Sequence, residues 1–416
     1  MTDTIRSQTV VRATGERDVR SVPSDSTPLF VLVAFFYIAF SNTSGYGDVS
    51  VAGFSGAFLF TVGVGIIGLH RSRGYRAVRQ YAVLASPLAA WAFVSAIAAW
   101  KSQTLRQSLG FVVWLIAIPG LAVFLRSRKT RVAFLLGFFV SVVHYGVVVL
   151  SRIAQSHDVL DPSLRTVAGA NRDAIGLLFV FAIPFIAAGT RRGWLRAGGV
   201  VLAILVLAAT GGRASVVGAI LGVIVAAFVG RGHRRWFRLA YLAIAFACVL
   251  LLAPSVLSAG GFTIQRFNSL FDTQPTTDTD LRILLLKKAV SITSQHPAFG
   301  VGLNNFEGAY TTVGESATYG FNAQRVQTYQ AHNTYAEAFA SFGIPGGVLY
   351  LLLTIGIVVL GVRTRHPLLR GPTGALVGVL AWSLFHSGLG NSVEFLAIAL
   401  LLAAAMSAWD SRTAEG

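Results

Sequence analysis

Long apolar runs recur along this chain and constrain its fold more than any other feature. They cover residues 28–40, 51–69, 81–100, 109–125, 132–150, 173–189, 197–210, 216–230, 239–257, 343–361, 374–385 and 395–409. Because several runs are shorter than the roughly 20 residues that a helix needs to cross a bilayer, we expect their helices to extend into flanking polar residues. With 54% hydrophobic and only 12% charged residues, the chain is predicted to be an all-α, polytopic membrane protein of about twelve spans.

Basic residues gather in alternate loops between these runs and predict which side each loop faces. The five clusters lie at residues 71–79, 126–131, 191–196, 231–238 and 363–370, and none of them contains Asp or Glu. By the positive-inside rule these loops are cytoplasmic, and both termini then face the cytoplasm as well. The longest loop, residues 258–342 between the ninth and tenth runs, is expected to lie outside.

This pattern divides the chain into a cytoplasmic tail (1–27), a transmembrane domain (28–409) and a second cytoplasmic tail (410–416). Residues 1–27 balance four arginines against four acidic residues and lack an apolar core, so we expect a disordered tail rather than a signal peptide. The preference for Arg over Lys, together with abundant Ala, Val and Gly, is typical of GC-rich bacterial genomes. The expected location is therefore a bacterial cytoplasmic membrane.

The net charge of +17 raises the question of nucleic-acid binding. The basic residues form short clusters between apolar runs rather than one stripe or a known binding motif, so membrane topology explains them better and no nucleic-acid partner is expected. These clusters would lie against anionic lipid headgroups. The single cysteine, Cys248, falls inside an apolar run, so no disulfide can form within the chain.

The external loop contains most of the residues that point to chemistry. A Thr- and Asp-rich segment, 272–280, precedes a pattern that predicts a helix over 281–293. Its apolar positions are Leu281, Leu284, Leu285, Ala289 and Ile292, with Arg282 and Lys287 off this stripe and Lys288 at its margin. Such a helix would lie on the outer leaflet or pack on the spans.

A Gly-rich turn follows at 296–306, where backbone amides would come close to whatever lies above. The polar segment His332-Asn333-Thr334-Tyr335-Ala336-Glu337 then precedes Gly343-Ile344-Pro345-Gly346-Gly347 and the next apolar run. A membrane protein rarely retains such a titratable cluster without a use.

Three motifs in this half of the chain resemble those of the O-antigen ligase family. They are Arg213 within Thr210-Gly211-Gly212-Arg213-Ala214-Ser215, Arg282 followed by the block from His296-Pro297 to Phe306, and His332-Asn333 with the glycines after it. They occur in the family order over roughly residues 197–360. Two positions depart from the family pattern: Gly212 replaces a frequent Ser, and Ser341 stands where a second acidic residue often follows Glu337.

The resemblance implies a glycosyltransferase-C-like arrangement of helices and a ligase or polymerase activity. Such enzymes take a glycan from a polyprenyl (undecaprenyl) diphosphate carrier and transfer it to a glycan or glycolipid acceptor. The resemblance further implies an inverting, metal-independent reaction without a cofactor. Membrane lipids surround the carrier, whose reactive head would lie at the outer headgroup level.

The residues themselves fit that chemistry. Arg213 and Arg282 offer planar, bidentate donors to the diphosphate leaving group, and a histidine such as His332 can accept a proton from the acceptor hydroxyl near neutral pH. We expect these three side chains to converge on one cavity open to lipid and to the outside. Asn333 and Glu337 are expected to support the site, and Glu337 forms a capping box with Thr334.

Other interpretations remain open. Arg213 also fits the role of a residue at a helix end whose charged group reaches the membrane interface. Arg282 also fits a surface ion pair with Asp280. Asp278 and Asp280 carry oxygen ligands of the kind that bind divalent cations, although no metal is expected. The main alternative function is a transporter or flippase of lipid-linked glycans, which would favour inverted repeats and ionisable residues at mid-membrane. A passive scaffold would leave the two arginines and His332 scattered in space.

Overall fold

The computed structural model describes residues 74–99, 102–156, 170–189, 213–229, 277–303, 331–386 and 392–415, together with isolated residues between 29 and 69, at 166–167, between 199 and 207, and at 305–306 and 389. Its long elements are all helices, as expected. They are α3 (Arg76–Ala99), α4 (Ser102–Arg126), α5 (Arg128–Ser156), α6 (Arg172–Gly189), α8 (Arg213–Phe228), α11 (Thr277–Gln295), α13 (Thr334–Thr364), α14 (Arg370–Trp382) and α15 (Ser392–Glu415).

Smaller elements join these helices. A 3-10 turn, η3 (Pro367–Leu369), connects α13 to α14. Two antiparallel pairs of two-residue strands complete the described part: β1 (Ser50–Val51) with β2 (Phe54–Ser55), and β3 (Thr166–Val167) with β4 (Ala170–Asn171).

Among the described residues, five helices are long and apolar enough to cross a membrane. They are 76–99, 104–126, 128–148, 334–364 and 393–410. Helices α3, α4 and α13 each begin before the apolar run that predicted them, so the runs do extend into flanking polar residues. The predicted runs 28–40, 51–69, 197–210 and 239–257 lie largely outside the described residues, and the count of twelve spans stays a prediction.

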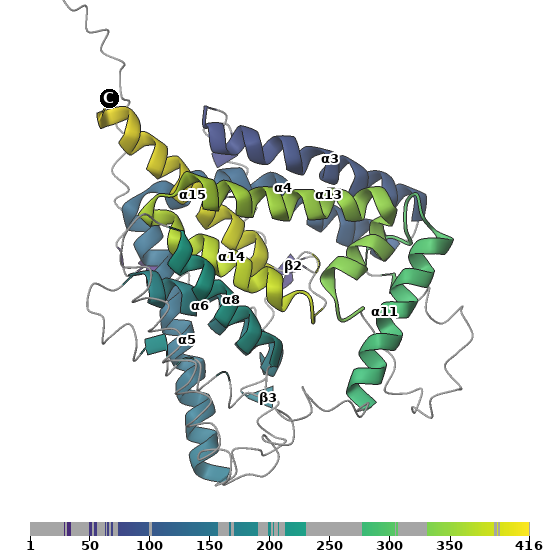
Figure 1. Ribbon diagram of the computed structural model, residues 1–416, viewed down its shortest axis with the longest axis horizontal. Helices are drawn as coiled ribbons and strands as arrows, with labels where there is room; N and C mark the ends of the chain where they lie inside the picture. The colour runs from purple at the N-terminus through teal and green to yellow at the C-terminus, as the bar shows by residue number, and fades with distance from the viewer. Residues whose placement is uncertain are drawn as a thin grey trace, which may run out of the picture.

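Close contact between glycines joins α8 to α14. Gly218 and Gly222 of α8 face Gly378 and Gly374 of α14: a Cβ added at either α8 glycine would come within 2.6 Å of the facing carbonyl oxygen. Small residues four apart on both helices allow this approach, and membrane helices commonly pack in this way. Figure 1 shows α6, α8 and α14 side by side in one part of the bundle.

This packing predicts a difference between two helical glycines. We expect Gly374→Ala to destabilise the protein, because its Cβ would lie 2.4 Å from the Gly222 carbonyl oxygen, whereas a Cβ at Gly110 of α4 meets nothing within 4 Å. Gly110→Ala should raise stability slightly, by up to about 1 kcal/mol of helix propensity. Thermal unfolding of both variants in detergent measures the difference, and equal melting temperatures would show that the α8–α14 contact is not tight.

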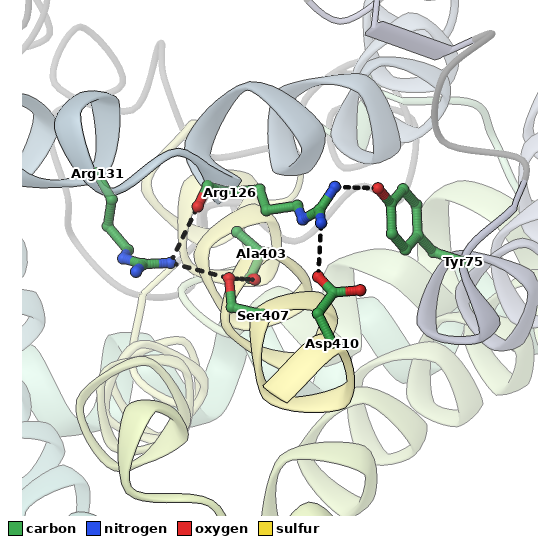
Figure 2. Close-up of polar contacts among 6 residues, drawn as sticks. All are labelled: Tyr75, Arg126, Arg131, Ala403, Ser407 and Asp410. Carbon is green, nitrogen blue, oxygen red and sulfur yellow. Dashed lines mark hydrogen bonds and ion pairs between the residues drawn. The ribbon is translucent and has the colours of Figure 1, made fainter. Parts of the chain in front are cut away.

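The described parts of two predicted basic clusters, 71–79 and 126–131, lie against the C-terminal part of α15 at one end of the bundle. Figure 2 shows Arg126 at the end of α4 donating to the hydroxyl of Tyr75 and pairing with Asp410 of α15, with 2.7 Å between Nη2 and Oδ2. Arg131 donates to the Ser407 hydroxyl at 3.2 Å. Asp410 is part of α15 because this helix continues past residue 409, into the predicted C-terminal tail, and ends at Glu415.

A further contact orients α8 and α14. The Nε of Arg370, at the start of α14, donates to the carbonyl oxygen of Val229, just after the end of α8, at 3.0 Å. The two helices therefore run antiparallel, and the first residue of α8 lies at the end of α14 that is opposite to Arg370. The candidate site lies at that opposite end.

Candidate functional site

The His-Asn motif forms the entry to α13. Asn333 is the N-cap: its Oδ1 accepts from the backbone amide of Ala336 at 2.9 Å. The predicted capping box of Thr334 with Glu337 is therefore wrong, because Thr334 lies inside the helix as its first residue. The N-cap is one residue earlier than predicted, because Asn is at least as good an N-cap as Thr and the backbone of Asn333 is extended.

Four hydrogen bonds hold this entry in place. Besides the cap, the Asn333 amide nitrogen donates to the Leu384 carbonyl at 2.9 Å, and Thr334 donates from its backbone to Ser383 at 2.9 Å and from its hydroxyl to the His386 carbonyl at 2.7 Å. The start of α13 is thus fixed to the segment that follows α14. Carbonyl groups just beyond the end of a helix are suitable acceptors for such donors.

His332 immediately precedes the cap and has φ 48°, in the left-handed region. This conformation is uncommon for a residue other than glycine and persists only where the surroundings impose it, which is often at functional sites. Its side chain is half-buried. The hydrogen bonds of Asn333 and Thr334 supply that constraint, and residue 332 directly precedes the positive end of the helix.

Helix α13 bends sharply at Gly343, which has φ 71° and ψ −176°. Pro345 has no amide hydrogen, so the carbonyl of Ser341 lacks its usual partner four residues later. The Gly-rich turn supplies the missing donors: the amide of Val301 donates to Ala340 at 2.9 Å, and that of Gly302 donates to Ser341 at 2.8 Å. The amides of Val301 and Gly302 therefore complete the bent helix, and for these two amides the structure corrects our expectation that they approach a ligand.

Further contacts fasten the bend. The amide of Ile344, freed by the bend, donates to Pro297 at 2.8 Å. From α3, the Trp91 indole donates to the Phe342 carbonyl at 2.8 Å, and the hydroxyl of Ser95 lies 2.6 Å from the Phe299 carbonyl and 3.1 Å from that of Ser341. The loop block from His296 and the motif at Gly343 are thus two halves of one backbone junction.

We expect Gly343→Ala to damage this junction. A Cβ there would lie 2.3 Å from the carbonyl oxygen of Ala298, in a backbone conformation that is nearly restricted to glycine and costs other residues about 1–3 kcal/mol. The neighbouring Ile344→Ala is the control, because that side chain is 49% exposed. Unfolding temperature and limited proteolysis of the external loop measure the effect; equal behaviour of the two variants would contradict the junction.

Helix α11 packs on the first segment of α13 through the stripe predicted for it. Leu285, Ala289 and Ile292 are buried in a cluster that includes Ala336 and Ala340. In Figure 1, α11 and this segment descend side by side from the bend. Lys287 is exposed, as expected, but Lys288 is only 5% exposed, so this lysine lies within the packed face and not at its margin.

The two arginines occupy defined places in the backbone. Arg213 is the first residue of α8, at the end where Gly218 meets Gly378 and Trp382 of α14, and α14 ends beside Asn333 and Thr334. Arg282 lies in the first half of α11, whereas the C-terminal end of α11 adjoins the bend. Arg213 and His332 thus share one end of the bundle. The side chains of Arg213 and Arg282 lie outside the described part, so convergence on one cavity stays a prediction.

Helix α11 begins at Thr277, four residues before the predicted start. Asp278 and Asp280 therefore lie in its first turn, where acidic residues interact favourably with the positive end of the helix dipole. Within the described residues, no group of three or more His, Cys, Asp or Glu could hold a metal ion.

Sequence reasoning missed a buried acid. Glu394, in the first turn of α15, is 1% exposed, and both of its carboxylate oxygens contact the hydroxyl of Tyr350, at 2.8 and 2.9 Å. Its signal in the sequence was one acidic residue directly before the apolar run 395–409.

Comparison with known proteins covers the same region. The family model described as O-antigen ligase (Wzy_C) matches residues 198–351, which include Arg213, Arg282 and His332. No curated protein matches the chain. This match confirms the resemblance to the O-antigen ligase family over residues 198–351, and the long apolar helices indicate a membrane protein.

Proposed function

We propose that this protein transfers a glycan from a polyprenyl diphosphate carrier to an acceptor hydroxyl at the outer face of a bacterial cytoplasmic membrane. The observation that carries the proposal is that the O-antigen ligase domain contains all three motifs. Within that domain, His332 lies in a constrained left-handed position at the entry of α13. Similarity to the O-antigen ligase family supports glycan transfer, either by ligation or by polymerisation.

In this proposal the two arginines bind the diphosphate. Breaking the sugar–phosphate bond leaves negative charge on the carrier, and guanidinium groups donate bidentate hydrogen bonds to phosphate oxygens. Arg213 begins α8 at the end of the bundle where α13 begins, and Arg282 belongs to α11, which packs on the first segment of α13. The N-terminus of α13 would add a favourable dipole for the same anion.

His332 then acts as the general base. The acceptor hydroxyl loses its proton as it attacks the anomeric carbon, and a neutral imidazole accepts that proton while the diphosphate departs. Attack from the side opposite the leaving group inverts the anomeric centre. Asn333 supports His332 by capping the helix, and Glu337 supports it from inside the first turn of α13, where it is buried.

The test is a transfer assay with the purified protein in proteoliposomes. It contains a glycan on polyprenyl diphosphate and separate candidate acceptors, with and without chelator, and mass spectrometry identifies which acceptor gains the glycan. Growth of the donor glycan itself would indicate a polymerase, and modification of a lipid acceptor a ligase. Movement of the donor across the bilayer without bond formation would support a transporter and refute the proposal.

A further inference from the structure

Two acidic side chains are buried among the described residues, Glu337 and Glu394, and the proposed transfer step uses neither as a reacting group. A buried carboxylate is costly unless hydrogen bonds compensate for lost hydration. Such a residue in a membrane protein therefore suggests a functional role. Glu394 lies beyond residue 351, outside the family domain, so the family match does not account for it.

The contacts of Glu394 place it inside the bend of α13. Its carboxylate binds the hydroxyl of Tyr350, which lies after the bend, and the ring of Tyr350 lies 5.9 Å from that of Tyr335, which lies before it. Fifteen residues separate these tyrosines, and a straight helix would place their Cα atoms about 22 Å apart. The bend therefore folds the two segments toward each other, with Tyr335, Tyr350 and Glu394 filling the inner angle.

Helix α15 also supports the bend next to Gly343. Phe395, beside Glu394, has its ring 5.8 Å from that of Phe111, and Phe111 lies 5.4 Å from Phe342. On the other side, Tyr335 donates from its hydroxyl to the Leu380 carbonyl of α14 at 3.0 Å. Tyr335 is three residues after His332. The bend and the hydrogen bonds of Asn333 and Thr334 to the segment after α14 thus together set where the His332 segment lies relative to α14 and α15.

We propose that Glu394 and Tyr350 are positioning residues for the transfer step: their hydrogen bonds act together with the backbone junction at Gly343 to set the angle of the bend in α13 and thereby the place of His332. This inference rests on the proposed function for its kinetic test. A buried pair of this kind contributes little net stability, because an apolar replacement of both partners is often nearly neutral. Its main consequence is geometric, and displacement of a reacting group by about 1 Å can lower a rate up to about 100-fold.

The kinetic test compares two buried tyrosines. Tyr350→Phe removes the hydroxyl that binds Glu394, and we expect kcat to fall about 10- to 100-fold with an unchanged KM for the donor. Tyr81→Phe is the matched control: Tyr81 is equally buried, at 1% exposure, and donates to the Leu115 carbonyl at 2.9 Å between α3 and α4. It should lose similar stability and retain kcat. Equal loss of kcat in both variants would overturn the proposal.

Two further comparisons separate positioning from general damage. Glu394→Gln retains an acceptor for the tyrosine hydroxyl and should retain most of kcat, whereas Glu394→Leu should behave like Tyr350→Phe.

A labelling measurement tests the inference without transfer activity. In a Cys248→Ser background, His332→Cys provides one thiol, whose reaction rate with a membrane-impermeant maleimide reports its position. We expect Tyr350→Phe to change this rate several-fold and Tyr81→Phe to leave it unchanged. If the wild-type protein transfers no glycan, the proposed function fails and this measurement still tests the positioning; an unchanged rate in Tyr350→Phe overturns it.

Discussion

His332→Ala should abolish glycan transfer without unfolding the protein. Loss of a general base costs about 10² to 10⁴ in rate, and the backbone hydrogen bonds that hold this entry belong to Asn333 and Thr334, which the substitution leaves in place. The left-handed φ of residue 332 adds a modest strain to any non-glycine residue, so Ala inherits a cost that His already bears. Initial rates in the proteoliposome assay measure the loss, and unfolding temperature measures the fold.

The same assay tests the alternative that Asp278 and Asp280, at the start of α11, hold a catalytic cation. Rates of wild type, His332→Ala and Asp278→Ala/Asp280→Ala are compared with and without chelator. We expect wild type and the double Asp variant to be active and insensitive to chelator. A chelator-sensitive wild type with an active His332→Ala variant would refute the mechanism. An inactive His332→Ala with a flat pH profile in the wild type would make His332 a ligand of the diphosphate and not the base.

Arg213→Lys and Arg282→Lys should each fold and lose most activity. An ammonium group is a point charge and cannot reproduce the two parallel hydrogen bonds of a guanidinium to phosphate. Loss of one such contact in a site that excludes water costs on the order of 2 to 4 kcal/mol of transition-state stabilisation, or about 30- to 1,000-fold in rate. The measurement is kcat/KM for the donor.

Arg126→Lys is the matched control for these arginines. Arg126 lies at the opposite end of the bundle, where it pairs with Asp410, and this exposed pair tolerates an ammonium group. We expect near-normal kcat/KM for Arg126→Lys. If Arg213→Lys and Arg282→Lys matched that control, the two arginines would only anchor their helices, and the proposed binding of diphosphate would be wrong.

Local pattern was sufficient to place α6 and the packed face of α11. The run 173–189 corresponds to α6 at residues 172–189, and the stripe of Leu285, Ala289 and Ile292 is the face of α11 that packs. These predictions succeeded because apolar periodicity depends only on neighbouring residues. The apolar run alone did not place the start of α13, because the run begins at Gly343 and the helix begins at Thr334, before the bend.

The sequence by itself determined that this is a membrane protein and that Arg126 and Arg370 belong to basic clusters between apolar runs. It also determined the order of the motifs that contain Arg213, Arg282 and His332. Each of these features depends only on composition or on spacing along the chain. Only the tertiary structure decided that Asn333 is the cap, that the amides of Val301 and Gly302 complete the bent helix, and that Glu394 lies within the bend. Each of these depends on which distant carbonyl or hydroxyl reaches a buried polar group left without a local partner. Buried polar groups must be satisfied, but the partner is chosen by packing between segments far apart in the chain.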